Sequence, residues 1–242
     1  MGHVTFEKYE EMVHCTMDPL WLRVDVPEGR SGPWQVRCSV ITQEAEQMMK
    51  LRGLINNNTR DYLLKAGTYT QLVHDNLGIM MSDTVTEVWE HRWPIEEAKG
   101  KVLINGLGIG MVANACLMKK EVRNVTVVEI DEDVIKLVAP HYQEKYGDRF
   151  RLVQADAFEY QPVVNERFDV VWHDIWLNIC DTNLPEMHRL HRKYGRRCNW
   201  QGSWMREACE NMREAMAIVD RGDKHPKAVA RVQKLASMLG IA

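Results

Sequence analysis

Glycines and an acidic residue follow apolar runs over Val102–Glu129 in a pattern suited to holding a nucleoside. The apolar run Val102–Ile104 precedes the glycine-rich stretch Asn105–Gly110, and the helix-like segment Met111–Lys120 follows it. A β-branched run comes next and ends in Glu129. Glycines let backbone N–H groups approach a ligand closely, because no Cβ intervenes. An acid at the end of the next strand can accept hydrogen bonds from both hydroxyls of a ribose. The segment therefore predicts a nucleoside cofactor.

The spacing of the glycines separates two classes of nucleoside cofactor. A dinucleotide fingerprint has glycine at its first, third and sixth positions. Here the glycines occupy the first, third and fifth positions, as Gly106, Gly108 and Gly110, and the sixth is Met111. With Glu129 nineteen residues after Gly110, the pattern resembles motif I of the class I S-adenosylmethionine-dependent methyltransferases. The resemblance implies S-adenosyl-L-methionine as the cofactor and all three glycines as cofactor-binding residues.

Later segments resemble further motifs of that family in the expected order. Glu129–Asp131 resembles the acidic end of the second strand, which implies that Ile130 covers one face of the adenine. The predicted strand Phe150–Val153 leads to Asp156 and Ala157. The family has an acid there that accepts from the adenine amino group, so the resemblance implies that these residues bind the cofactor as well.

The next predicted strand, Phe168–Trp172, leads into His173 and Asp174. The family places this segment beside the methionine part of the cofactor and the reacting centre. Methyl transfer from a sulfonium needs an aligned nucleophile and, where required, one base. His173 and Asp174 are the candidates for the catalytic role. The alternative for His173 is a strand-end residue that points into the helix layer.

The segment Gly67–Pro94 resembles the entry to the spermidine synthase family. It reads as a short strand with Tyr69 and Gln71, a turn, an apolar strand and an acid-rich helix. In that family a small amino-terminal β domain precedes the cofactor domain, and a Gln on its strand reaches the ribose. The resemblance implies this role for Gln71, and an ordinary exposed strand residue is the alternative.

Two departures from the spermidine synthase family concern the amine substrate. The glycine loop has Leu107 and Ile109 where the family carries an Asp, and Trp176 stands where the family has a small polar loop. A buried ammonium needs a paired carboxylate, and only Asp174 is visibly available. The resemblance therefore implies the fold more than the substrate.

The order of elements predicts an α/β fold, a doubly wound, Rossmann-like, mostly parallel sheet with a small β-containing amino-terminal domain. The sheet is expected to be shortened at its carboxyl-terminal edge, because the one strand candidate after Trp176 is Arg196–Gln201. Met205–Val219 and Lys227–Leu239 have helical apolar spacing. We expect three regions, the amino-terminal domain over 1–94, the cofactor domain over 95–204 and a helical segment over 205–242.

The amino-terminal region has the turn and strand signals of two hairpins. Leu20–Val26 and Trp34–Ile41 are expected to form the first, and Tyr69–His74 and Gly78–Met81 the second. A helix is expected from Gln43 to about residue 51.

A basic cluster, His188–Arg197, holds five Lys or Arg in ten residues and no acid, with Trp176, Trp200 and Trp204 on its flanks. Cations and indoles suit a planar or anionic acceptor, either a small molecule or a nucleotide-like one. The alternative is a solvated helix end whose cations complement the helix dipole.

Composition limits the remaining classes of function. A formal charge of −3 over 242 residues argues against wholesale adhesion to nucleic acid, and the six cysteines form no CxxC pair. We expect reduced thiols, no metal site, no membrane span and a cytoplasmic protein, and a homodimer is left open. The predicted function is an S-adenosylmethionine-dependent methyltransferase. An aminopropyltransferase and a non-catalytic nucleoside-binding protein are the alternatives.

Overall fold

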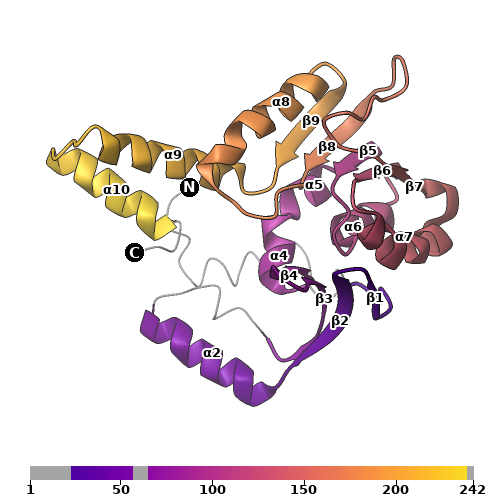
Figure 1. The fold of residues 1–242 in the computed structure, drawn as a ribbon, viewed down its shortest axis with the longest axis horizontal. Coiled ribbons are helices and arrows are strands. Elements are labelled where there is room, and N and C mark those ends of the chain that lie inside the picture. Colours follow the sequence, from indigo (N-terminus) through magenta and orange to yellow (C-terminus); the bar gives the residue numbers. More distant parts are fainter. Residues whose placement is uncertain (1–22, 57–64, 239–242) are drawn as a thin grey trace.

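The computed structural model describes residues 23–56 and 65–238 of the chain (Figure 1). They contain a small antiparallel sheet and a larger parallel sheet. The strands of the small sheet pair in chain order: β1 (Gly29–Ser31), β2 (Trp34–Ile41), β3 (Gly67–His74) and β4 (Gly78–Ser82). Helix α2 (Gln43–Asn56) connects β2 to β3, and its Ala45 N–H donates to the Thr42 hydroxyl at 3.2 Å.

The first hairpin differs from its prediction. Its outer strand is β1, whereas the expected strand Leu20–Val26 begins outside the described residues and has no strand structure over 23–26. The Val24 N–H donates to Asp83 Oδ2 at 3.0 Å, and the Val24 carbonyl accepts from the Thr70 hydroxyl at 3.0 Å. The Asp83 carboxylate and the Thr70 hydroxyl thus occupy the backbone groups that hydrogen bonding to a neighbouring strand would need. Residues 23–26, called the strap below, therefore run beside β3 without forming a strand. The second hairpin is confirmed by the pairing of β3 with β4.

The larger sheet has five parallel strands in the order β7-β6-β5-β8-β9. Its strands are β5 (Gly100–Asn105), β6 (Val122–Glu129), β7 (Phe150–Gln154), β8 (Phe168–His173) and β9 (Cys198–Ser203). The prediction that Val102–Ile104 forms a central parallel strand is confirmed. The strand order reverses between β5 and β8, and the loops at that point diverge to open a crevice.

Helices flank the larger sheet on both faces. The helical segments after the small sheet are α4 (Val85–Glu90), α5 (Arg92–Glu97), α6 (Met111–Met118), α7 (Glu132–Tyr146), η2 (Gly147–Arg149), η3 (Asp181–Asn183), α8 (Leu184–Tyr194), α9 (Arg206–Asp220) and α10 (Pro226–Met238). In Figure 1 the paired helices α9 and α10 extend away from the sheet on the side opposite α6 and α7. None of the helices described is long and apolar enough to cross a membrane.

Alternate residues of β5 belong to two different cores. Val102 and Ile104 pack with residues of α6 and α7, whereas Leu103 packs with residues of α8. Strand periodicity accounts for this division, since successive side chains point to opposite faces. The fold is thus the doubly wound α/β type that the sequence predicts, with a shortened edge at β9. The boundaries at residues 94 and 204 remain predictions.

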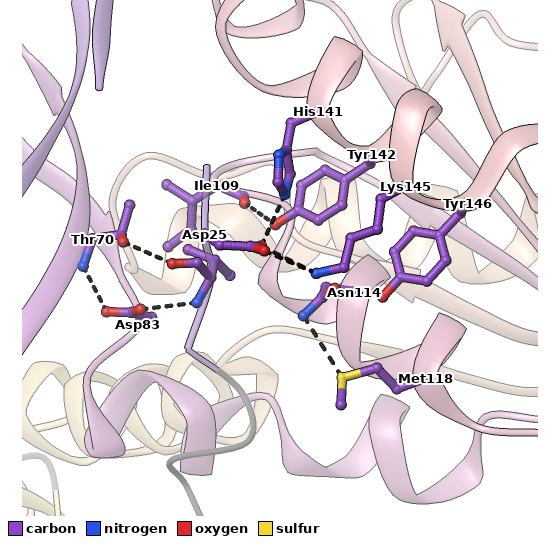
Figure 2. Close-up of polar contacts among 11 residues, drawn as sticks. Asp25, Thr70, Asp83, Ile109, Asn114, Met118, His141, Tyr142, Lys145 and Tyr146 are labelled. Carbon is purple, nitrogen blue, oxygen red and sulfur yellow. Dashed lines mark hydrogen bonds and ion pairs between the residues drawn. The ribbon is translucent and has the colours of Figure 1, made fainter. Parts of the chain in front are cut away.

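The small sheet is fixed to the larger domain through the strap and helix α7 (Figure 2). Asp25 accepts from His141 Nε2 at 2.9 Å and from Lys145 Nζ at 3.1 Å. Asp83 meanwhile binds the strap to β3, because its second oxygen accepts from the Thr70 N–H at 2.8 Å. These contacts hold the small sheet against helix α7 of the larger domain.

Candidate functional site

A cavity of about 380 Å³ lies where the small sheet meets the carboxyl ends of the parallel strands. Leu72 and Met81 of the small sheet form one wall, and the loops after β5, β6, β7 and β8 form the others. Seven of the site residues predicted from the sequence line it: Gly106, Gly108, Glu129, Ile130, Asp156, Ala157 and Asp174. The topology brings these residues together, because parallel strands present their carboxyl ends at one edge.

The glycine loop between β5 and α6 has two positions that only glycine fits. Gly106 has a φ of +100°, and a Cβ there would meet the backbone carbonyl of Asp174. Gly110 has a φ of +74°, and a Cβ there would meet the ring of Tyr142. Gly106 therefore lets the loops after β5 and β8 touch at the floor of the cavity. Gly110 lies behind the cavity, where it allows α7 to pack on the start of α6.

The Glu129 carboxylate sits at the end of β6 and is hydrogen-bonded to its surroundings. It accepts from the N–H groups of Leu107 at 2.7 Å, Ile130 at 2.8 Å and Asp131 at 2.9 Å. Burial raises the pKa of Glu129, and these three bonds oppose that shift. A carboxylate offers about four acceptor positions, so capacity for a further donor remains.

Some of the lining residues have the features of an aromatic-base pocket. Ile130 is 64% exposed although it is large and apolar, and it lines the cavity together with Ala157. Asp156 accepts from the Phe158 N–H at 2.7 Å through Oδ1, which orients its carboxylate. An exposed apolar side chain at a cavity mouth is what a bound planar ligand would cover.

The cavity lining also contains a buried His–Asp pair that the sequence pattern did not indicate. His91, in the turn between α4 and α5, is 1% exposed. Its Nε2 lies 2.8 Å from Asp174 Oδ2, and its Nδ1 lies 2.7 Å from the Glu87 carbonyl oxygen. Both partners are acceptors, so the ring is satisfied as the doubly protonated imidazolium. Its pKa reflects this, because burial lowers it but the attraction of Asp174 and Glu87 raises it further, to about 9.

Two more cavity residues interact with His91. The Trp204 ring stacks on His91 with centroids 6.0 Å apart and planes 9° apart. The Glu87 carboxyl lines the cavity, and burial raises its pKa to about 7, against the opposing effect of His91. The available signal was the four-residue spacing of Glu87 and His91 in the acid-rich helix before β5. Nothing in the sequence indicated that this helix would face the loop after β8.

Besides Gly110, two predicted site residues lie away from the cavity. Gln71 is on β3 next to Leu72, and adjacent strand residues point to opposite faces, so Leu72 lines the cavity whereas the Gln71 side chain accepts from Arg37 Nε at 3.2 Å. His173 is fully buried at the end of β8 and bonds to Asn105.

The basic cluster His188–Arg197 contributes no side chain to the lining of the cavity within the described residues. Arg189 forms an exposed ion pair with Glu159 at 3.3 Å. Lys193 is closer, since its Nζ donates to the carbonyls of Ala157 at 3.0 Å and Phe158 at 2.9 Å. Through Lys193, the basic cluster therefore supports the cavity loop after β7, although its side chains do not line the cavity. In the same described ranges no three His, Cys, Asp or Glu side chains are grouped to hold a metal ion.

Comparison with known proteins finds partial structural matches and one matching family model. Solved structures that match in part include a tRNA (uracil-54, C5)-methyltransferase from Pyrococcus abyssi in complex with S-adenosyl-L-homocysteine, with 20% identity, a TM-score of 0.37, and 53% of this chain and 30% of that one covered. The CcbJ methyltransferase from Streptomyces caelestis matches with 19% identity, a TM-score of 0.37, and 45% and 43% covered. A dimethyladenosine transferase from Plasmodium falciparum matches with 17% identity, a TM-score of 0.36, and 45% and 37% covered.

This chain thus spans less than half the length of each of these three structures. Curated protein sequences give no match. The family model described as the spermine/spermidine synthase domain matches residues 84–231, from α4 through α9 and into α10, and so includes every strand of the parallel sheet. That span is more than half of the chain, and the protein is a member of the spermine/spermidine synthase domain family.

Proposed function

We propose that the protein is an S-adenosylmethionine-dependent transferase whose cofactor occupies the cavity, with methyl transfer as its reaction. The observation that carries the proposal is the shared cavity. The glycine loop, Glu129, Asp156 and Asp174 all line it, and together they offer what a nucleoside with a sulfonium tail requires. Its volume of about 380 Å³ is within the usual range for small-ligand sites.

The residues present fit such a cofactor. Glu129 retains acceptor capacity for ribose hydroxyls, and Asp156 is oriented to accept from an adenine amino group. Gly106 lets the glycine loop lie against the loop after β8, where a Cβ would collide with the Asp174 carbonyl. The exposed side chain of Ile130 supplies an apolar surface for a base.

The charge of the cavity supports a cationic ligand. Five carboxyl groups line it: Glu87, Glu129, Asp131, Asp156 and Asp174. Among its described lining residues there is no lysine or arginine, and His91 is the one basic side chain. A concave site with one sign of charge concentrates ligands of the other sign. The sulfonium centre of S-adenosylmethionine meets this requirement.

The protein has a limited chemical task, because S-adenosylmethionine supplies an alkyl group already activated by the sulfonium. Loops after β5 and β8 align the acceptor and exclude water. Glu87 is suited to take the acceptor's proton, since its pKa of about 7 lets it do so near neutral pH. Asp174 is held by His91, so in this proposal it orients the reacting groups while Glu87 acts as the base.

The proposed acceptor is a small planar molecule, or the base of a nucleotide, bound near Trp176 and Trp204. Trp176 is held by a bond from its Nε1 to Glu186 at 2.8 Å, and Trp204 is held by its stacking on His91. An anionic group would have to remain outside the acidic cavity. The acceptor that contacts these residues is therefore proposed to be uncharged or cationic at its reacting end.

Aminopropyl transfer is the second candidate, and one observation favours it. Glu87 and Asp174 both line the cavity, so two carboxylates are present where the sequence indicated one. Two carboxylates can neutralise an amine acceptor. The family match is compatible with this reaction.

Ligand binding separates these candidates. Thermal unfolding is measured with S-adenosylmethionine, S-adenosylhomocysteine, decarboxylated S-adenosylmethionine and NAD. Ligand at 100 times its dissociation constant stabilises the fold by ~2.7 kcal/mol, which raises Tm by roughly 5 to 10 °C. Methyl transfer predicts a response to the first two ligands, and aminopropyl transfer predicts preference for the decarboxylated form.

A response to NAD alone would indicate a dehydrogenase, and no response at all would favour a non-catalytic protein of this fold. The Glu129→Ala variant should abolish the shift. The matched control is Glu132→Ala, three residues on, where the side chain is 64% exposed and pairs with Lys136. A shift that survives Glu129→Ala would overturn the ribose assignment.

A further inference from the structure

Three polar residues form a buried row across the end of the parallel sheet. Asn105 of β5 pairs in register with His173 of β8, which pairs in register with Ser203 of β9. Asn105 and His173 are fully buried, and Ser203 is 7% exposed. Central strands of such sheets are usually apolar on both faces, so three polar residues in one register need an explanation.

Hydrogen bonds define the state of this polar row. Asn105 Nδ2 donates to His173 Nδ1 at 2.7 Å, so His173 is neutral and carries its proton on Nε2, which faces Gln201 Oε1 at 3.5 Å. Gln201 Nε2 in turn donates to the His191 carbonyl at 3.0 Å. Burial, together with repulsion from His191, lowers the pKa of His173 to about 3.

His191 extends the polar row to helix α9. Arg206 donates to its Nδ1 at 2.9 Å, so its Nε2 donates to the Ser203 hydroxyl at 2.9 Å. Burial and the Arg206 charge lower the pKa of His191 to about 4. Both imidazoles are therefore uncharged at neutral pH, and each ring is held in one tautomer by its partners.

Each member of the polar row directly precedes a residue that lines the cavity. Gly106 follows Asn105, Asp174 follows His173, and Trp204 follows Ser203. The backbone repeats the connection, since the Asp174 N–H donates to the Asn105 carbonyl at 2.8 Å and the Trp204 N–H donates to the His173 carbonyl at 2.9 Å. The polar row therefore sets the point from which three cavity loops depart.

Stability alone is a weak reason for the polar row. Asn105 Oδ1 and the Tyr194 hydroxyl are buried with no hydrogen-bond partner among the described residues. An unpaired buried polar atom is costly, whereas apolar side chains at both paired positions would fold at similar or lower cost. What a polar row provides and an apolar one does not is a fixed register and orientation at the strand ends.

We propose that His173 is a positioning residue, which acts through the Asn105–His173–Ser203 row to hold Asp174 and Trp204 in place around His91. The two cavity residues contact the same imidazole, one by hydrogen bond and one by stacking. A displacement of the loop after β8 therefore changes the environment of His91 directly. The effect on turnover rests on the proposed function, but the effect on His91 does not.

The test compares three variants of the full chain. His173→Gln keeps a donor and an acceptor in the polar row, whereas His173→Leu removes both. The matched control is Val171→Ala, on the same strand and face, which leaves a cavity in the core without touching the row. The first measurement is the pKa of His91 by NMR. Wild type, His173→Gln and Val171→Ala should keep it near 9, and His173→Leu should bring it down toward the ordinary value of histidine.

The second measurement is S-adenosylhomocysteine affinity and, once the acceptor is known, turnover. We expect a loss on the order of 100-fold in turnover for His173→Leu, with recovery in His173→Gln, because small displacements at a reacting centre are that costly. If His173→Leu does not fold, it is replaced in the test by the double variant Asn105→Val, His173→Val. This double variant leaves no unpaired amide. An unchanged His91 pKa in that variant would overturn the proposal. If wild type binds none of the nucleosides, the proposed function fails while the His91 measurement still decides the role of His173.

Discussion

The imidazole of His91 and the carboxylate of Asp174 lie 2.8 Å apart, although 83 residues separate them in the chain. His91 comes from the turn before the central strand, and Asp174 from the loop after its neighbour β8. The pair therefore joins the entry of the larger domain to its candidate reacting centre.

Because of this pair, we expect the free energy of unfolding to decrease at alkaline pH. The folded pKa of His91, about 9, is above its ordinary value near 6.5, so its contribution is fully present below pH 6.5 and is lost as pH rises through 9. We expect the free energy of unfolding to fall by ~3 kcal/mol across this window. Urea unfolding at pH 6 and pH 9.5 measures it. His91→Gln should lose most of this dependence, and His141→Gln, at the surface pair with Asp25, should keep it. A His91→Gln variant with the full wild-type decline would contradict the assignment.

Glu87 is predicted to control the pH profile of catalysis. Its pKa of about 7 places the rise in turnover with pH near neutrality. Glu87→Gln should lower turnover by roughly 10²- to 10⁴-fold and remove that limb of the profile, because the amide cannot accept a proton. Glu97→Gln, an exposed change on α5, is the control. A normal profile in Glu87→Gln would assign the base elsewhere.

Gly106→Ala should reduce both stability and ligand affinity, although it adds only one methyl group. The new Cβ would meet the carbonyl oxygen of Asp174 at a φ of +100°. We expect a loss of ~1–3 kcal/mol in the free energy of unfolding and of S-adenosylhomocysteine binding, measured by urea titration and calorimetry. Gly78→Ala is the matched control, because it has a φ of +82° and nothing within 4 Å of the added Cβ. Equal losses in both variants would mean that backbone conformation, and not contact with the loop after β8, explains the effect.

Lys193 should differ from the other cations of the basic cluster. Its two bonds to the carbonyls of Ala157 and Phe158 support the loop that carries Asp156. Lys193→Gln should weaken cofactor binding by about 1 kcal/mol, or roughly 5-fold, and the triple variant Arg192→Gln, Arg196→Gln, Arg197→Gln should leave it unchanged. Calorimetric titration distinguishes the two. Loss of acceptor turnover in the triple variant, with cofactor binding intact, would support the sequence-based hypothesis that the basic cluster binds a planar or anionic acceptor.

The parallel sheet and its glycine loop could be predicted because their signals are local. Apolar strands, positive-φ glycines and an acid at the end of β6 each occur within a few residues, and parallel topology then brings them to one edge. Strand β1 could not be predicted in this way. Asp83, about 60 residues away, accepts the backbone N–H of Val24, and the Thr70 hydroxyl donates to the Val24 carbonyl. Strand propensity does not reveal this competition for the backbone groups.

The direction in which a side chain points was the second property that could not be predicted from the sequence. Gln71 and Leu72 are neighbours, and a shift of one residue along a strand exchanges the face that lines the cavity for the opposite one. The side chains of His173 and Asp174 also have different surroundings. His173 is the last residue of β8, and Asp174 is the first residue of the loop that follows. The sequence named both residues as catalytic candidates, and the structure separates a buried one from one that lines the cavity. His91 required knowledge of which helix faces which loop.

The division of the cavity wall between two sheets has a thermodynamic consequence. Trp34 of the small sheet donates to Asp131 at 2.8 Å, and Asp131 in turn caps α7 of the larger domain. A ligand enclosed by both sheets loses its affinity when either one opens. Saturation with ligand therefore couples the two halves, so that they melt in a single calorimetric transition even where the unliganded chain would melt in two steps.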